Sequence, residues 1–129
     1  MNTKASRPAV ILYVEENRAL LETVRDVLEF AGWYVRRFDV GLGYALIESP
    51  EHFDLLLIDR DLRGCDGLAL VRRARQLAHR RGTPIIVISL EDCAGEAVRA
   101  GADAFLRKPN NLIGLVDTIR RLLAARVGA

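Results

Sequence analysis

The stretch LLLID at residues 55–59 is an unbroken run of four apolar residues that ends in a carboxylate. Two similar apolar runs occur elsewhere in the chain, VILYV at 10–14 and IIVI at 85–88. None of the three alternates between apolar and polar residues, as a strand with one wet face would. Short continuous apolar runs are typical of strands buried on both faces, which indicates a mostly parallel sheet covered by helices.

Two further strand candidates and five helical patterns surround these runs. The strand candidates, 33–38 and 103–107, carry charges, which suits the edges of a sheet where one side meets water. The spacing of apolar residues predicts helices near 18–31, 41–48, 68–78, 94–100 and 112–123. Strands that alternate with helices predict an α/β fold, a single doubly wound five-stranded parallel sheet with the flavodoxin-like order 2-1-3-4-5 and five helices.

Length and composition indicate one soluble domain. The chain has 129 residues, of which 50% are hydrophobic and 28% are charged. We expect a tail at 1–8, the domain at 9–125 and a second tail at 126–129. The net charge of +2 is too small for a non-specific nucleic-acid binder, and no apolar stretch approaches the ~20 residues of a membrane span.

Cysteine and arginine usage adds two expectations. Cys65 and Cys93 lack the spacing of metal ligands, so we expect free thiols in a reducing cytoplasm. From the charge and the apolar stretches, we expect neither a membrane nor a nucleic acid as a direct partner. Arginine supplies 17 of the 19 basic residues, and we expect the arginines on helices to cover solvated faces.

Polar side chains follow the strands of the predicted sheet. Glu15 and Glu16 follow the first apolar run, Asp59 the second, Ser89 the third, and Lys108 the last edge strand. Ligands of open parallel sheets bind beyond the carboxyl ends of the strands, so we expect these groups to converge. Each alone has a simpler interpretation, as a helix cap, a turn residue or a surface charge. Together they predict a Mg²⁺ ion that relieves the repulsion between carboxylates, beside an aspartate able to accept a phosphoryl group.

These motifs resemble the receiver domain of response regulators, the CheY-like phosphoacceptor half of bacterial two-component signalling. The resemblance covers about residues 9 to 125 and is carried by ILYVEEN at 11–17, FDLLLID at 53–59, DG at 66–67, PIIVIS at 84–89 and GADAFLRKP at 101–109.

The resemblance implies a phosphoacceptor and a metal site. Asp59 would be the phosphorylated aspartate. Glu15, Glu16 and Asp59 would hold Mg²⁺ together with the backbone carbonyl of Asp61.

The resemblance also implies a switch. Ser89 and Lys108 would bind the phosphoryl group, and the movement of Ser89 would let Phe105 turn inward and reshape the face formed by the fourth helix, fifth strand and fifth helix. The bond before Pro109 is expected to be cis. Such a protein is a phosphorelay component and not an enzyme, fed by a histidine kinase or a histidine phosphotransfer protein, with an output partner that the sequence does not identify.

Several positions depart from the family pattern. Glu16 is one methylene longer than the usual aspartate, which predicts a shifted or weaker metal site. Asp61 adds a carboxylate that could support the metal or repel a phosphodonor. Arg63 could reach Asp61 or the phosphate, although a solvated side chain is the simpler expectation. Leu90 should hinder access to Asp59. The segment 89–108 is shorter than usual, which predicts a short fourth helix and casts doubt on standard dimerisation through it.

Two other functions stay open at this point. In a pseudo-receiver, an interaction module that keeps the fold, Glu16, Asp61 and Leu90 would have abolished phosphorylation. A flavin or nucleotide binder on the same fold would need a glycine- or hydroxyl-rich phosphate loop, where the chain instead has the acidic segment 15–17. The GLG segment at 41–43 lacks the rest of a dinucleotide fingerprint.

Overall fold

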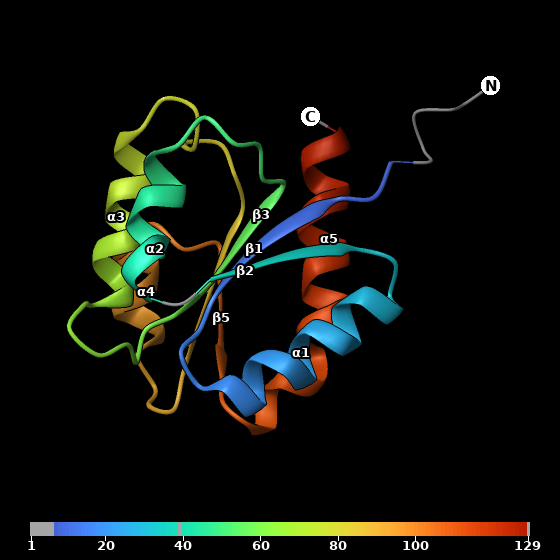
Figure 1. Ribbon diagram of the computed structural model, residues 1–129, viewed down its shortest axis with the longest axis horizontal. Helices are drawn as coiled ribbons and strands as arrows, with labels where there is room; N and C mark the ends of the chain where they lie inside the picture. Colours follow the sequence, from blue (N-terminus) through green and yellow to red (C-terminus); the bar gives the residue numbers. More distant parts are fainter. Residues whose placement is uncertain (1–6, 39, 129) are drawn as a thin grey trace.

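Three apolar strands form the middle of the sheet in the computed structural model, which describes residues 7–38 and 40–128 (Figure 1). They are β1 (Val10–Val14), β3 (Leu55–Asp59) and β4 (Ile85–Ser89), and the edge strands are β2 (Tyr34–Phe38) and β5 (Ala104–Arg107). All neighbouring strands pair in parallel, in the order β2-β1-β3-β4-β5. The predicted α/β class, strand order and edge positions are confirmed.

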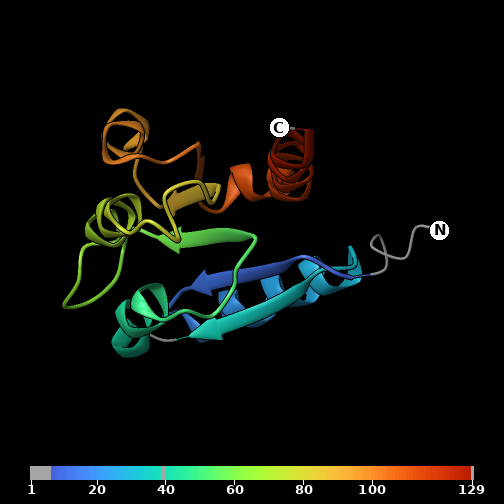
Figure 2. The same cartoon turned by 90° about the horizontal axis from the view of Figure 1, so that it is seen from above.

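Helices cover both faces of this sheet. Figures 1 and 2 show α1 and α5 on one face and α2, α3 and α4 on the other. Their bounds are Arg18–Phe30 for α1, Val40–Glu48 for α2, Gly67–Gln76 for α3, Ala94–Ala100 for α4 and Leu115–Gly128 for α5, with a 3-10 helix, η2, at Asn110–Gly114. None of the helices in the described ranges has the length and apolar character that crossing a membrane requires.

Side chains of the central strands fill two separate cores. Along β1, Leu12 and Val14 belong to the core under α2, α3 and α4, whereas Ile11 and Tyr13 belong to the core under α1 and α5. All four side chains are fully buried. This burial on both faces explains why the strand sequence is continuously apolar.

The start of α3 lies directly against the strand end that carries Asp59. A Cβ atom on Gly67, the first residue of α3, would lie only 2.2 Å from the Asp59 carbonyl oxygen. The Asp66 side chain accepts a hydrogen bond from the Leu68 N–H (3.0 Å) and so caps the helix. The 66–67 pair thereby fixes the loop after β3 against the backbone of the strand.

Helix ends differ from the prediction at two places. The extended backbone of Leu77 ends α3 at Gln76, two residues before the expected 78. The last predicted helix divides in two, because Leu112 lies in η2 and α5 begins at Leu115. The helix then continues to Gly128, so residues 126–128, which were expected to form a tail, are helical.

Arg80, in the turn after α3, is a buried arginine that the sequence did not single out. Its side chain is 2% exposed. The guanidinium donates hydrogen bonds to the backbone carbonyls of Leu46, Ile47 and Ser49, at 2.9, 3.0 and 2.8 Å, and lies 4.6 Å from the centre of the Phe53 ring. Arg80 therefore caps the end of α2 from within the core.

Candidate functional site

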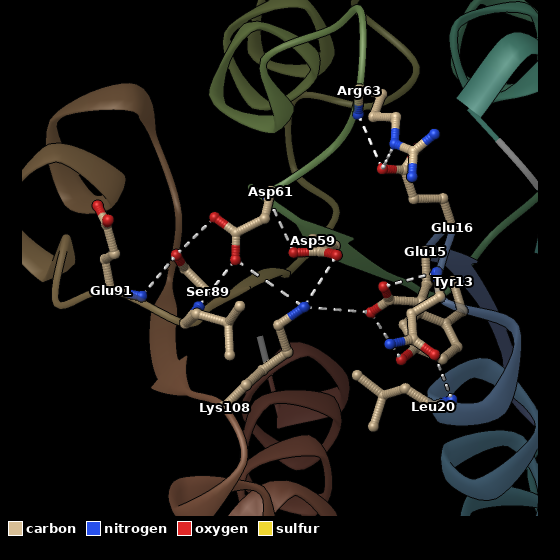
Figure 3. Close-up of polar contacts among 12 residues, drawn as sticks. Tyr13, Glu15, Glu16, Leu20, Asp59, Asp61, Arg63, Ser89, Glu91 and Lys108 are labelled. Atoms are coloured by element: carbon tan, nitrogen blue, oxygen red, sulfur yellow. Dashed lines mark hydrogen bonds and ion pairs between the residues drawn. The ribbon is translucent and has the colours of Figure 1, made fainter.

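A cavity of about 430 Å³ opens where the carboxyl ends of the strands meet. It is lined by Glu15, Glu16, Asn17, Asp59, Asp61, Arg63, Leu90 and Lys108. The structure thus brings together the acidic groups and the lysine that the sequence places after separate strands (Figure 3). A larger cavity of about 620 Å³ lies near the other end of the sheet, between the start of β1 and the last turns of α5.

Asp59 lies at the centre of the group. It is the last residue of β3 and its side chain is 1% exposed. Its Oδ2 atom lies 3.0 Å from Lys108 Nζ, and its Oδ1 atom accepts a hydrogen bond from the Asp61 N–H (2.9 Å). Two fixed donors therefore orient the carboxylate, which faces the cavity at the strand end.

Lys108 is held in place by the backbone that surrounds it. Its peptide bond to Pro109 is cis, the isomer that the resemblance implies, and its N–H donates to the Ser89 carbonyl (2.8 Å). The buried ammonium lies within 4 Å of three carboxylates, with Asp59 at 3.0 Å, Glu15 at 3.7 Å and Asp61 at 3.9 Å. A single ammonium group therefore lies among three acidic side chains, which leaves acidic groups without a cation of their own.

Glu15 is buried beside Asp59 and holds its proton more tightly than an ordinary glutamate. Burial, and next the neighbouring Asp59 carboxylate, raise the pKa of Glu15 to about 8. The Tyr13 hydroxyl donates to Glu15 Oε1 (3.3 Å), and the Asn17 N–H donates to Oε2 (3.1 Å). Burial and the nearby Glu15 carboxylate also raise the pKa of Tyr13, so its phenol remains a donor.

Glu16 turns away from Asp59. Its Oε1 atom accepts a hydrogen bond from the Arg63 N–H (2.9 Å), and Figure 3 shows the side chain directed toward the Arg63 backbone. The Arg63 guanidinium is 95% exposed and lies 4.0 Å from Glu16. The simpler expectation of a solvated Arg63 is confirmed, while the expected metal ligand Glu16 is engaged elsewhere.

Asp61 makes contacts that the sequence did not reveal. Its Oδ1 atom accepts from the Ser89 hydroxyl (3.0 Å), and its Oδ2 atom accepts from the Leu90 N–H (2.8 Å). The Ser89 oxygen in turn accepts from the Glu91 N–H (3.1 Å). Sequence reasoning considered the Asp61 carboxylate only as a support for the metal or a charge that repels a phosphodonor, because nothing in the residue order shows where the side chain points.

The carboxylate oxygens fit Mg²⁺ as two ligands and not as a complete cage. Among residues 7–38 and 40–128, no three acidic, histidine or cysteine side chains form a ready-made metal site. Magnesium usually takes one or two carboxylates and keeps several waters. Glu15 and Asp59, adjacent and short of positive charge, match that requirement, and the cavity leaves room for water.

A chain of contacts leads from this site to β5. Phe105 is partly buried and packs against the core under α2, α3 and α4. The Arg107 side chain donates to the Leu90 carbonyl (3.0 Å), and Ser89 pairs with Arg107 in the sheet register. The expected switch residues Ser89 and Phe105 therefore lie on two directly paired strands.

Both cysteines are free thiols. Cys93 is buried just before α4, and Cys65 is half-buried in the loop before α3. Burial raises the pKa of each thiol, which disfavours the reactive thiolate. The expectation of two free thiols is confirmed.

Comparison with known proteins identifies a family. The model of the "response regulator receiver domain" family matches residues 11–120. The response regulator MprA of Mycobacterium leprae is 34% identical over 116 residues, which are 88% of this chain and 50% of that protein. The chain thus spans about half the length of the curated relatives that it matches.

Solved structures agree with this match. A CheY-like response regulator receiver domain protein from Methanospirillum hungatei has a TM-score of 0.84 and 31% identity, with 95% of this chain and 98% of that one covered. A response regulator from Burkholderia pseudomallei, solved with a phosphorylated aspartic acid, calcium ion and citrate, has a TM-score of 0.73 and 25% identity, with 84% and 64% covered.

Proposed function

We propose that this chain, which belongs to the family of response regulator receiver domains, accepts a phosphoryl group on Asp59 in a Mg²⁺-dependent reaction. The observation that carries the proposal is the position of the Asp59 carboxylate. It ends β3 at the floor of the cavity, 3.0 Å from the buried ammonium of Lys108. A carboxylate oriented beside a fixed cation is suited to act as a nucleophile toward phosphorus.

Asp59 would attack the phosphorus atom of a phosphohistidine on a histidine kinase or a histidine phosphotransfer protein. The new bond joins a carboxylate oxygen to phosphorus, and the bond from phosphorus to the imidazole nitrogen breaks. The electron pair of that bond stays on the imidazole, which takes a proton from water. Lys108 neutralises the charge that gathers on the transferred oxygens, and the Ser89 hydroxyl donates a hydrogen bond to one of them.

Glu15 and Asp59 are the side chains best placed to hold Mg²⁺, and the Asp61 backbone carbonyl and Glu16 remain proposed further ligands. When bound, the ion shields the negative charge of the phosphoryl oxygens. Glu15 must release its proton to become a ligand, since burial raises its pKa to about 8. Glu16 must leave the Arg63 N–H.

Phosphorylation would act on Ser89 and Phe105. It adds nearly two negative charges and three acceptor oxygens at Asp59. The Ser89 loop is tied to β5 through the Lys108 N–H and the Arg107 side chain, so a shift of Ser89 would carry to Phe105 and to the face formed by α4, β5 and α5. An output partner that prefers the altered face would read the signal by a shift of population.

Acetyl phosphate with Mg²⁺ tests the proposal. We expect intact-mass spectrometry to show one added phosphoryl group on the protein, peptide mapping to place it on Asp59, and a chelator to prevent it. Asp59→Asn should abolish the label, whereas Asp54→Asn, a matched change just before the other end of the same strand, should keep it. An unlabelled protein, or a label that survives Asp59→Asn, would refute the phosphoacceptor role and leave an interaction module.

A further inference from the structure

The Asp61 carboxylate accepts hydrogen bonds from donor groups that surround the phosphoacceptor Asp59. One of its oxygens accepts a hydrogen bond from the Ser89 hydroxyl (3.0 Å), and the other accepts one from the Leu90 N–H (2.8 Å). The second oxygen also lies 3.9 Å from Lys108 Nζ. Three donors, from β4, the loop that follows it and the residue directly after β5, therefore converge on one carboxylate (Figure 3).

These donors are the ones that an incoming phosphoryl group would need. Ser89 and Lys108 are assigned to the phosphoryl oxygens in the proposed function, and the Leu90 N–H lies beside the Ser89 hydroxyl and donates to the same acceptor. Asp61 follows Asp59 by two residues, and its own N–H donates to Asp59 Oδ1 at 2.9 Å. The Asp61 carboxylate thus lies next to the phosphoacceptor, already hydrogen-bonded to its donors.

We propose that Asp61 is an internal substitute for the phosphoryl group, a positioning residue that holds Ser89, Leu90 and Lys108 until phosphorylation displaces it. This inference rests on the proposed phosphoacceptor function. Two consequences follow. Without phosphate, the Ser89 hydroxyl is already drawn toward the active site. Phosphorylation must first break the hydrogen bonds of Asp61, so Asp61 weakens the binding of any phosphoryl group at Asp59.

Two simpler roles for Asp61 predict different behaviour. If Asp61 acted only through its negative charge, neutralising another acid near Ser89, such as Glu91 in the loop after β4, would have a comparable effect. If its carboxylate mainly supported Mg²⁺, its removal would weaken the binding of a phosphoryl mimic. If instead the phosphoryl group must displace Asp61, removing the Asp61 carboxylate should strengthen the binding of a phosphoryl mimic and free the Leu90 N–H.

Beryllofluoride, a phosphoryl mimic, separates these cases when it is titrated at saturating Mg²⁺ into the wild-type protein, Asp61→Ala and Asp61→Asn. We expect Asp61→Ala to bind at least about tenfold more tightly, because charge-assisted hydrogen bonds no longer compete. Asp61→Asn keeps one acceptor oxygen and should fall between the two. Glu91→Gln is the matched control, since its carboxylate is 81% exposed and neutralising it should leave the affinity unchanged.

Hydrogen exchange of the Leu90 amide, followed by NMR without metal or beryllofluoride, gives a second readout. We expect exchange at least about tenfold faster in Asp61→Ala than in the wild-type protein, and restored protection once the mimic binds. Unchanged Leu90 exchange, or unchanged or weaker beryllofluoride binding in Asp61→Ala, would overturn the inference alone. Failure of all three proteins to bind the mimic would overturn the proposed function and the inference with it.

Discussion

Glu15 shows how a buried acid links the site to pH at the scale of a single residue. A glutamate in the unfolded chain ionises near its ordinary value of 4.5, whereas burial and the Asp59 carboxylate raise the pKa of Glu15 to about 8 in the folded protein. The folded state thus binds an extra proton between these values. The resulting stabilisation is complete below about pH 4.5 and is lost as the pH rises through 8.

We therefore predict that the free energy of unfolding of the metal-free protein falls between pH 5 and 8 by at least about 1 kcal/mol from Glu15, the equivalent of roughly one unit of pKa shift. Urea denaturation in a chelator, compared with the same measurement on Glu15→Gln, isolates this contribution. Glu16→Gln should retain the fall. Parallel pH curves for the wild-type protein and Glu15→Gln would show that Glu15 is ionised throughout.

Side-chain directions at the site are what sequence reasoning could not supply. The positions of Asp59, Ser89 and Lys108 follow from strand ends, because parallel strands bring their carboxyl ends to one edge. Glu16 and Asp61 accept hydrogen bonds from the N–H groups of Arg63 and Leu90, which lie far away along the chain. Their orientation depends on loops that only the folded chain brings within reach.

Among the elements, the junction of α2 with the segment after α3 depends on Arg80. The last carbonyl groups of a helix lack N–H partners within the helix. The Arg80 guanidinium donates hydrogen bonds to the carbonyls of Leu46 and Ile47, and also to that of Ser49. The sequence shows 17 arginines without distinguishing this one. Its burial could not be predicted, because it depends on where α2 ends relative to a residue that lies 33 positions after Ile47 in the chain.

Arg80→Ala is predicted to destabilise the protein by about 2–4 kcal/mol, since it removes three charged hydrogen bonds to the end of α2, including the one to the Ile47 carbonyl, and the contact with the Phe53 ring. Urea denaturation measures the loss, and hydrogen exchange should show it first at the end of α2. Arg81→Ala is the matched control on the next residue, which is exposed and should cost less than about 0.5 kcal/mol. Equal losses for the two variants would contradict the capping role.

At the scale of the whole molecule, the sheet separates two cores, one under α2, α3 and α4 and the other under α1 and α5. The continuous apolar strands predicted this layered architecture, since side chains must be buried on both faces. The site is connected more closely to one end of the sheet, because Ser89 continues through the 90–93 loop into α4 and the Lys108 N–H and Arg107 side chain tie that loop to β5.

α4 is the shortest α-helix in the described residues and has little stability of its own against such a shift. It has seven residues, and the Cys93 side chain at its N-cap makes no capping hydrogen bond within the described chain. Helices this short gain little stability from their own hydrogen bonds and depend on packing. We predict that beryllofluoride with Mg²⁺ changes amide hydrogen exchange mainly in residues 90–107, with little change in α1 and β2. Asp59→Asn should show no change, and a response centred on α1 with α4 unaffected would mean that the signal leaves the site by another route.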